Sequence, residues 1–540
     1  MKKLIYLSML GGSFLLGSCE NKMDEKHKNP DAFTETQIQY LFADGAIKTI
    51  ESDYADWYNH VFRMLGTYLQ TAARREGKDR LNVYDIRDDK GKWEKFYVAR
   101  MSSLTEIDKI YNILSSDGKA QNVIYKEAGR ILQAYNTIMT TDFFGNMPYS
   151  EAFTARNNIY GGNVILRPKY DDQKDIYYKL IDELADASAY FKDAKFENEA
   201  IETEFKRQDV IYGGDLSKWY KFANSLRLRC AMRISNVDEA KATSVIKSLN
   251  VADLILDNTD NAVLKIKDKT VEPNNSIQRA FRESHNNNNG YYYFAPQPMV
   301  QLLKDAADPR LHVFFQPASD DDGKVLEGAT DIIGYPVSAD DAINIVREQS
   351  AEEIRNTYGI YNAVTFRNNY QLPQGIGITA AEVAFYLSEA AVRGLCGLDA
   401  EAYYNKGILL SVQNYYGYYA QSDADSKVES IAKRDVSDAV LTDWLQNSTF
   451  AFNRAKALEQ IATQKWLHYN IMQPFESWAE YRRTDLPVLE DDRESGTLLN
   501  KSEAPVRFLY PSSEASMNTE NYNLQSEYNQ PDVRLWWDVK

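Results

Sequence analysis

The chain has 540 residues, of which 62 are Lys or Arg and 78 are Asp or Glu, so its formal net charge is −16. This acidic balance repels a phosphate backbone, and nucleic acid is therefore not expected as a partner. Hydrophobic residues make up 44% of the chain and charged residues 26%, which is typical of a globular protein and excludes a polytopic membrane protein.

The first 18 residues predict a signal peptide for export. Lys2 and Lys3 precede an apolar run that is too short to span a bilayer, and small residues come directly before Cys19. The sequence from Leu16 to Cys19 resembles the bacterial lipobox, which predicts that Cys19 is lipidated and anchors the chain to the outer membrane. An ordinary secretory signal followed by a chance cysteine is the alternative.

Residues 19–33 are polar and show no periodicity, so they predict a flexible tether between the lipidated Cys19 and a domain that begins at residue 34. Within this tether, residues 22–25 resemble the acidic surface-export signal of lipoproteins from Bacteroidetes. The resemblance implies that the protein faces the cell exterior.

Helical periodicity is the main signal in the rest of the chain. Residues 215–234 are the clearest case, because Trp219 lies on an apolar stripe, Arg229 and Arg233 lie off it, and Asp215 is suited to be the N-cap. The same reasoning predicts further helices at 34–50, 54–73, 102–115, 121–140, 176–191, 299–305, 380–394, 401–418 and 451–472.

These helices indicate a mainly α fold. Two close pairs, 102–115 with 121–140 and 380–394 with 401–418, predict a scaffold of tetratricopeptide-like helix pairs. Because no strict repeat motif recurs, unrelated helical hairpins are the alternative.

We expect a single domain over residues 34–540, in which large irregular loops form a ligand-binding lobe. The segments 255–379 and 484–540 are expected to be largely irregular. Loops of such length are uncommon in compact domains unless they carry function.

Motifs for catalysis are missing from the sequence. The five His residues show no metal-ligand spacing, and the chain has no Gly-x-Ser-x-Gly motif, phosphate-binding loop or dinucleotide fingerprint. We therefore expect no enzyme activity and no cofactor, although a glycoside hydrolase with an undetected carboxylate pair stays open. Residues 320–323 (DDDG) favour a solvated acidic loop over a calcium site, and a bridge between Cys230 and Cys396 is left open.

The strongest binding feature is the run at residues 285–294 (HNNNNGYYYF), in a chain with 37 Tyr. Amides donate and accept hydrogen bonds, and aromatic faces take the apolar face of a sugar ring, so this loop offers both at one place. The alternative is a surface loop whose rings are tucked into the core. A weaker loop of the same kind surrounds Tyr84, and the expected ligand contacts are Tyr84, Asn289, Tyr291, Tyr292 and Tyr293.

Several stretches together resemble SusD/RagB nutrient-binding outer-membrane lipoproteins, and they occur in the expected order from the lipobox to the C-terminus. They are residues 141–152 (TDFFGNMPYSEA), 167–171 (RPKYD), 214–229 (GDLSKWYKFANSLRLR), 381–394 (AEVAFYLSEAAVRG), 478–483 (WAEYRR) and 536–538 (WWD).

This resemblance implies a lipid-anchored, mostly α-helical protein that sits as a lid on a SusC-like TonB-dependent outer-membrane barrel. Such a protein captures oligosaccharides and passes them to the barrel without catalysis. Capture of peptides, as in some members of the family, is the second hypothesis, and a glycoside hydrolase is the third. Only Cys19 matches a functional residue of the family position by position.

Overall fold

The computed structural model describes residues 37–51, 53–75, 89–265, 276–286, 290–291, 293–490 and 505–539. The predicted signal peptide, Cys19 and the predicted tether lie outside these residues. For residues 285, 286, 290 and 291 we describe the backbone alone. Helices dominate the described chain, which confirms the predicted mainly α class.

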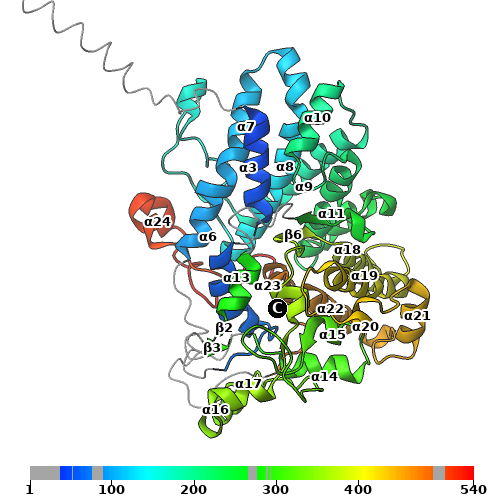
Figure 1. The fold of residues 1–540 in the computed structure, drawn as a ribbon. Helices are drawn as coiled ribbons and strands as arrows, with labels where there is room; N and C mark the ends of the chain where they lie inside the picture. The colour runs from blue at the N-terminus through cyan, green and yellow to red at the C-terminus, as the bar shows by residue number, and fades with distance from the viewer. Residues whose placement is uncertain are drawn as a thin grey trace, which may run out of the picture.

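Three helices, α3, α7 and α8, lie side by side in the first part of the chain (Figure 1). Gly45 of α3 lets α7 approach, because a Cβ atom there would lie 2.5 Å from the Leu104 side chain. The helical elements of this part are α3 (Ile38–Ile50), η1 (Asp56–Leu65), α4 (Gly66–Tyr68), α6 (Lys90–Glu94), η2 (Lys95–Arg100), α7 (Met101–Ile113) and α8 (Ser116–Phe144).

The helix predicted at 215–234 is α11. Asp215 caps it as expected, since its carboxylate accepts hydrogen bonds from the backbone N–H groups of Ser217 and Lys218. Trp219 on the apolar stripe is fully buried. The neighbouring elements are η3 (Asn157–Tyr160), α9 (Gln173–Lys192), α10 (Glu199–Gln208), α11 (Leu216–Ile234) and α12 (Glu239–Ser248).

Arg229 and Arg233 lie off the apolar stripe of α11, but they do not form a solvated polar face. Both side chains are buried, because carboxylates of helices from the last third of the chain cover that face. The periodicity of the sequence shows that these charged residues lie off the apolar stripe. It gives no information about the oppositely charged partners that allow them to be buried.

Residues 255–379 are expected from the sequence to be largely irregular, but they contain several short helices and strands. Local caps stabilise these short helices; at the start of α17, Ser350 and Glu353 form a capping box. The helical elements are η4 (Val251–Asp253), η5 (Asn258–Asp260), α13 (Ser276–Glu283), α14 (Gln297–Asp305), α15 (Leu311–Phe314), α16 (Ala339–Glu348), α17 (Ala351–Thr357) and η6 (Ala363–Arg367).

Strands are few and short in the described residues. They form three antiparallel pairs, β1 with β6, β2 with β3 and β4 with β5. Their bounds are β1 (Ala262–Leu264), β2 (His285–Asn286), β3 (Gly290–Tyr291), β4 (Phe315–Gln316), β5 (Ile360–Tyr361) and β6 (Gly375–Ile378).

The last part of the chain contains the predicted pair at 380–394 and 401–418, which the structure confirms as α18 and α19 packed against each other. α22 also packs against α18, and α23 packs against α22. The elements are α18 (Ala380–Val392), α19 (Ala400–Gln421), α20 (Glu429–Ala432), α21 (Asp438–Gln446), η7 (Arg454–Lys456), α22 (Ala457–Tyr469), α23 (Pro474–Thr484), α24 (Ser512–Met517) and α25 (Thr519–Asn523).

One hydrophobic core runs through the described chain, and its largest fully buried apolar side chains are Trp57, Trp219, Trp478 and Trp537. The indole N–H of Trp537 donates to the Asp142 carboxylate of α8 at 2.9 Å, so the C-terminal end is joined to the first group of helices. The segment expected to be irregular at 484–540 therefore contributes to the core.

The close packing of α18 on α19 predicts opposite effects for two glycines of α19. A Cβ atom at Gly407 would lie 2.5 Å from the Phe385 ring, whereas none would meet a heavy atom within 4 Å at Gly417. We expect Gly407→Ala to lower the free energy of unfolding by about 1–3 kcal/mol through overpacking. Gly417→Ala should raise it by about 0.5–1 kcal/mol through helix propensity. Urea unfolding measures both, and equal stability of the two variants would contradict this packing.

Candidate functional site

Most of the five predicted ligand residues lie outside the described residues. Tyr84, Asn289 and Tyr292 lie outside the described residues, and Tyr291 is described only as backbone in β3. Tyr293 is 1% exposed, with its ring centroid 5.7 Å from Phe62 and 5.1 Å from Phe281. The structure therefore places Tyr293 in the core. This contradicts its predicted role as a ligand contact and agrees with the alternative interpretation, in which rings of the loop are tucked into the core.

One end of each predicted ligand loop lies at the same place in the structure. Ala73, just before the loop that contains Tyr84, pairs with Phe294, just after the tyrosine run. Their backbone N–H groups each donate to the other's carbonyl, at 3.2 and 3.1 Å. The sequence separates these residues by more than two hundred positions, so only the fold brings them together.

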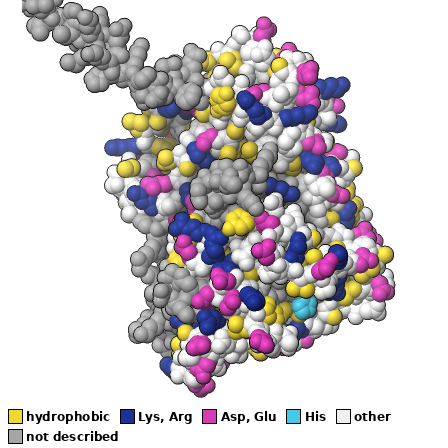
Figure 2. Space-filling model, in the orientation of Figure 1, with side chains coloured by type: hydrophobic (Ala, Val, Ile, Leu, Met, Phe, Trp, Pro, Cys, Tyr) yellow, Lys and Arg dark blue, Asp and Glu magenta, His cyan; other side chains and the backbone are white. Residues whose placement is uncertain are grey.

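A group of four polar and aromatic side chains lies on the helices beside the β2–β3 hairpin. We call it the tyrosine platform, and its members are Tyr54, Tyr58, Arg279 and Glu283. The two tyrosine rings are stacked with centroids 5.8 Å apart, and the Arg279 guanidinium lies 4.3 Å from the Tyr54 ring centroid. Figure 2 shows Lys and Arg side chains gathered in the region where Figure 1 places α13, the helix that carries Arg279.

Hydrogen bonds hold the tyrosine platform together. Glu283 accepts hydrogen bonds from the Tyr54 hydroxyl and, at 2.8 Å, from Arg279 one helical turn away. Burial and the Glu283 carboxylate raise the pKa of Tyr54 to about 12. Burial acts to raise the pKa of Glu283, but the bonds from Tyr54 and Arg279 outweigh it and lower that pKa. At neutral pH the platform therefore presents a neutral phenol, a carboxylate and a guanidinium.

The chemistry of the tyrosine platform suits a polyhydroxylated ligand. Half-exposed tyrosine rings offer flat apolar faces, while the carboxylate accepts hydrogen bonds and the guanidinium donates them. These residues are not among those predicted from the sequence. Tyr54 with Tyr58, and Arg279 with Glu283, have the i, i+4 spacing that brings side chains together on a helix. That spacing is also common on ordinary helix surfaces, so it does not identify the site without the fold.

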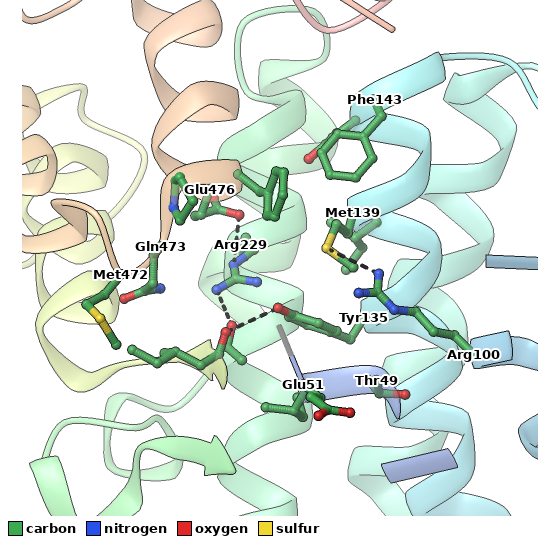
Figure 3. A pocket seen from close by; sticks show the side chains of 17 residues that line it. Thr49, Glu51, Arg100, Tyr135, Met139, Phe143, Arg229, Met472, Gln473 and Glu476 are labelled. Carbon is green, nitrogen blue, oxygen red and sulfur yellow. Dashed lines mark hydrogen bonds and ion pairs between the residues drawn. The ribbon is translucent and has the colours of Figure 1, made fainter. Parts of the chain in front are cut away.

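A pocket lined by polar and apolar side chains lies between the end of α3, the second half of α8 and the start of α23 (Figure 3). The Arg229 guanidinium donates to the Glu382 carboxylate at 2.8 Å and to the Gly377 carbonyl at 2.8 Å. On the opposite wall, the Nε–H of Arg100 donates to the Lys48 carbonyl at 3.1 Å. The polar lining includes Glu51, Arg100, Tyr135, Arg229, Gln473 and Glu476.

The carboxylates behind this pocket belong to a larger group of fully paired charges, which we call the buried ion cluster. Arg233 lies 3.2 Å from Asp142 and 2.7 Å from Glu480, and it also bonds Glu476. The carboxylates of Asp142, Glu476 and Glu480 are therefore each held in an ion pair with Arg233. The members of the cluster are Asp142, Arg233, Glu389, Lys465, Glu476, Glu480 and Arg483.

Glu389 shows how strongly the buried ion cluster is coupled. Its carboxylate lies 2.6 Å from the Lys465 ammonium and 2.7 Å from the Arg483 guanidinium. Burial acts to raise the pKa of Glu389, but these two cations outweigh it and lower the pKa to about 2. Glu389 is therefore ionised at neutral pH.

A second hollow is an open groove between α6–η2, α24 and the coil after α8. Aromatic rings form part of its wall, with Tyr97 and Phe153 stacked at 5.5 Å. Its rim carries exposed aliphatic side chains, including Val98, Leu166 and Met517. The groove is more apolar than the tyrosine platform and offers fewer partners for sugar hydroxyls.

The described part of the chain contains neither a cluster of metal-ligating side chains nor a helix suited to cross a membrane. Its His, Cys, Asp and Glu side chains form no group of three suited to hold a metal ion. Asp320 accepts hydrogen bonds from the backbone N–H groups of Asp322 and Lys324. Cys230 and Cys396 are both free thiols. None of the described helices has the length and apolar character needed to cross a membrane.

A sequence model of the family described as "Starch-binding associating with outer membrane" matches residues 30–511. The chain belongs to this SusD-like family. The match covers the described helices from α3 to α23, and it confirms the resemblance seen in the sequence. No curated protein matches the chain.

Solved structures of SusD-like proteins share the fold. A Bacteroidetes SusD-like protein has 24% identity and a TM-score of 0.72, covering 94% of this chain and 100% of its own. A chitin-binding protein has 22% identity and a TM-score of 0.71, and a SusD homologue from Bacteroides fragilis has 22% identity and a TM-score of 0.69. Each of the latter two covers 93% of this chain and 100% of its own.

The pairing of Glu389 predicts a loss of stability in acid. A carboxylate with a pKa of about 2 in the folded protein and 4.5 when unfolded stabilises the fold above pH 4.5, and this contribution is lost as the pH falls toward 2. Glu389→Gln should therefore flatten this part of the pH dependence. At pH 7 it should lower the free energy of unfolding by about 3–5 kcal/mol, because it leaves buried cations underpaired.

Urea unfolding at several pH values between 7 and 3 measures this effect. Glu429→Gln is the matched control, since Glu429 pairs with Lys433 on an exposed helix face and should change stability by less than about 1 kcal/mol. Equal losses in the two variants would contradict a dominant role for the buried pair.

Proposed function

We propose that this protein is a cell-surface lipoprotein that captures oligosaccharides and delivers them to a SusC-like TonB-dependent outer-membrane transporter. The observation that carries the proposal is the match to a starch-binding, outer-membrane-associated family over residues 30–511. The acidic charge of the chain and its tyrosine content fit this role, since neutral glycans are bound through rings and hydrogen bonds rather than through ion pairs.

The ligand site in this proposal combines the predicted loops with the tyrosine platform. The loop that contains Tyr84 follows Ala73, and the loop that contains Asn289 ends at Phe294, the residue that pairs with Ala73. Tyr54 lies on the helical segment that packs against α13, which in turn leads directly into β2. Ligand contacts from the loops and the platform would therefore come from one side of the same structural unit.

The proposal includes weak binding and no chemistry. A receptor that hands its cargo to a transporter needs a Kd in the micromolar to millimolar range, or about −8 to −4 kcal/mol. The absence of catalytic motifs from the sequence supports binding without turnover. A purified protein that cleaved a bound oligosaccharide would contradict this part of the proposal.

Calorimetry against a panel of glycans and peptides tests the ligand. We expect saturable glycan binding that weakens about tenfold in Tyr58→Ala, Tyr291→Ala or Tyr292→Ala, because each removes one stacking ring worth roughly 1.4 kcal/mol. Tyr528→Ala is the matched control, since Tyr528 is an exposed tyrosine on another part of the chain. Binding that is unchanged in all three variants would place the site elsewhere. Binding of peptides alone would replace glycan capture by peptide capture.

The lipid anchor makes a separate prediction. Replacing Cys19 by Ala removes the only thiol at the lipobox position, so the protein should leave the outer-membrane fraction and no longer carry acyl chains in mass spectra. Cys396→Ala is the control and should stay in the membrane fraction.

Purification of the wild type from native membranes should also yield a TonB-dependent barrel. Acylation elsewhere, or a soluble wild-type protein, would contradict the anchor.

A further inference from the structure

The coil between α8 and α9 has an unusual charge for this chain. Residues 154–169 (TARNNIYGGNVILRPK) contain Arg156, Arg167 and Lys169 but no acidic residue, in a protein whose net charge is −16. All three cations are exposed. Arg156 lies 3.2 Å from Glu106 and Lys169 lies 3.6 Å from Glu151, so the positive charge is only partly offset.

The same coil exposes aliphatic side chains to an unusual degree. Leu166 is 78% exposed and Ile159 is 62% exposed, and Val164 and Ile165 are exposed as well. Val98 and Met517, which share the rim of the apolar groove with Leu166, extend this surface. Figure 2 shows hydrophobic side chains at the upper left edge of the molecule, over the part of the ribbon between α8 and α9 in Figure 1. A group of exposed aliphatic side chains on one short segment is typical of an interaction surface.

The coil between α8 and α9 lies near the start of the described chain. Arg156 and Tyr160 both contact Glu106 on α7. α7 runs antiparallel to α3, since Ser103 bonds Asp44 and Arg100 bonds the Lys48 carbonyl. Glu106 is therefore about one helical turn from the first residues of α3.

The chain that leads to the predicted lipid anchor enters the fold at this same end of α3. Cys19 precedes Gln37 by about 18 positions, which limits their separation to about 60 Å. Such a tether keeps the protein near a bilayer without fixing which face is turned toward it. A second contact close to its attachment point would fix that face.

We propose that residues 156–169 contact an anionic lipid surface, with Ile159, Val164 and Leu166 entering the headgroup region and Arg156, Arg167 and Lys169 binding lipid phosphates. The proposal rests on the lipid anchor of the proposed function. Aliphatic side chains flanked by cations are the residues that favour an anionic membrane interface. A protein interface would instead be expected to centre on aromatic side chains, which this exposed segment supplies only through Tyr160.

Quenching by brominated lipid tests this contact in the full lipidated chain. In a Cys396→Ser background, an environment-sensitive fluorophore is attached either at Leu166→Cys or at the control position Val440→Cys, an exposed residue of α21. Each protein is reconstituted into vesicles of phosphatidylethanolamine and brominated phosphatidylglycerol. We expect about threefold more quenching at residue 166 than at residue 440, and a loss of this difference when Arg156, Arg167 and Lys169 are replaced by Gln.

Three outcomes would overturn the proposal. Equal quenching at both positions would mean that the tether alone holds the protein at the membrane. Strong quenching at residue 440 would turn a different face toward the lipid. A blue shift at residue 166 that appears only when a TonB-dependent barrel is present would assign the surface to a protein partner. Glycan affinity in calorimetry is independent of these measurements, so failure of this contact is distinguishable from failure of the proposed receptor function.

Discussion

The buried ion cluster is the interaction on which the arrangement of the helices depends. Its charges come from α8, α11, α18, α22 and α23, which are spread over more than three hundred positions of sequence. Removing charges from water is costly, and the cost is offset only when each ion meets oppositely charged partners with good geometry. Glu480 meets three of them, Arg233, Lys465 and Arg483, each at 2.7 Å. The helices can therefore pack in few other registers without leaving a charge unpaired.

The same cluster connects the scaffold to the C-terminal segment of the described chain. Asp142 accepts hydrogen bonds from Tyr177 and Trp537 in addition to its ion pair with Arg233. Arg482, beside the cluster, donates to the carbonyls of Asp142 and Val506. Displacing α8 would thus disturb the C-terminal segment as well. With the interior fixed in this way, the surface loops can change in sequence without altering the scaffold.

The sequence predicted the long helices well because each has enough residues for its periodicity to be measured. It failed where the deciding information lies outside the segment. Arg229 and Arg233 have the spacing of a solvated helix face, and only the carboxylates of Glu382 and Glu480 explain their burial. The short helix α17 has a recognisable capping box but only seven residues, which is too few for a periodic signal.

The candidate site shows the same limit more sharply. A run of tyrosines gives no indication of which rings face solvent, and the structure buries Tyr293 beside Phe62 and Phe281. The tyrosine platform joins Tyr54, just before η1, and Tyr58 of η1 to residues of α13 more than two hundred positions away, so no local pattern identifies it. The tyrosine platform and the coil between α8 and α9 (residues 154–169) share no residue. They are also carried by different helices, since η1 and α13 hold the former whereas α7 holds the latter through Glu106. Substitutions at Tyr58 and at Leu166 therefore act on different surfaces of one rigid scaffold, and ligand capture can be changed without moving the contact to the membrane.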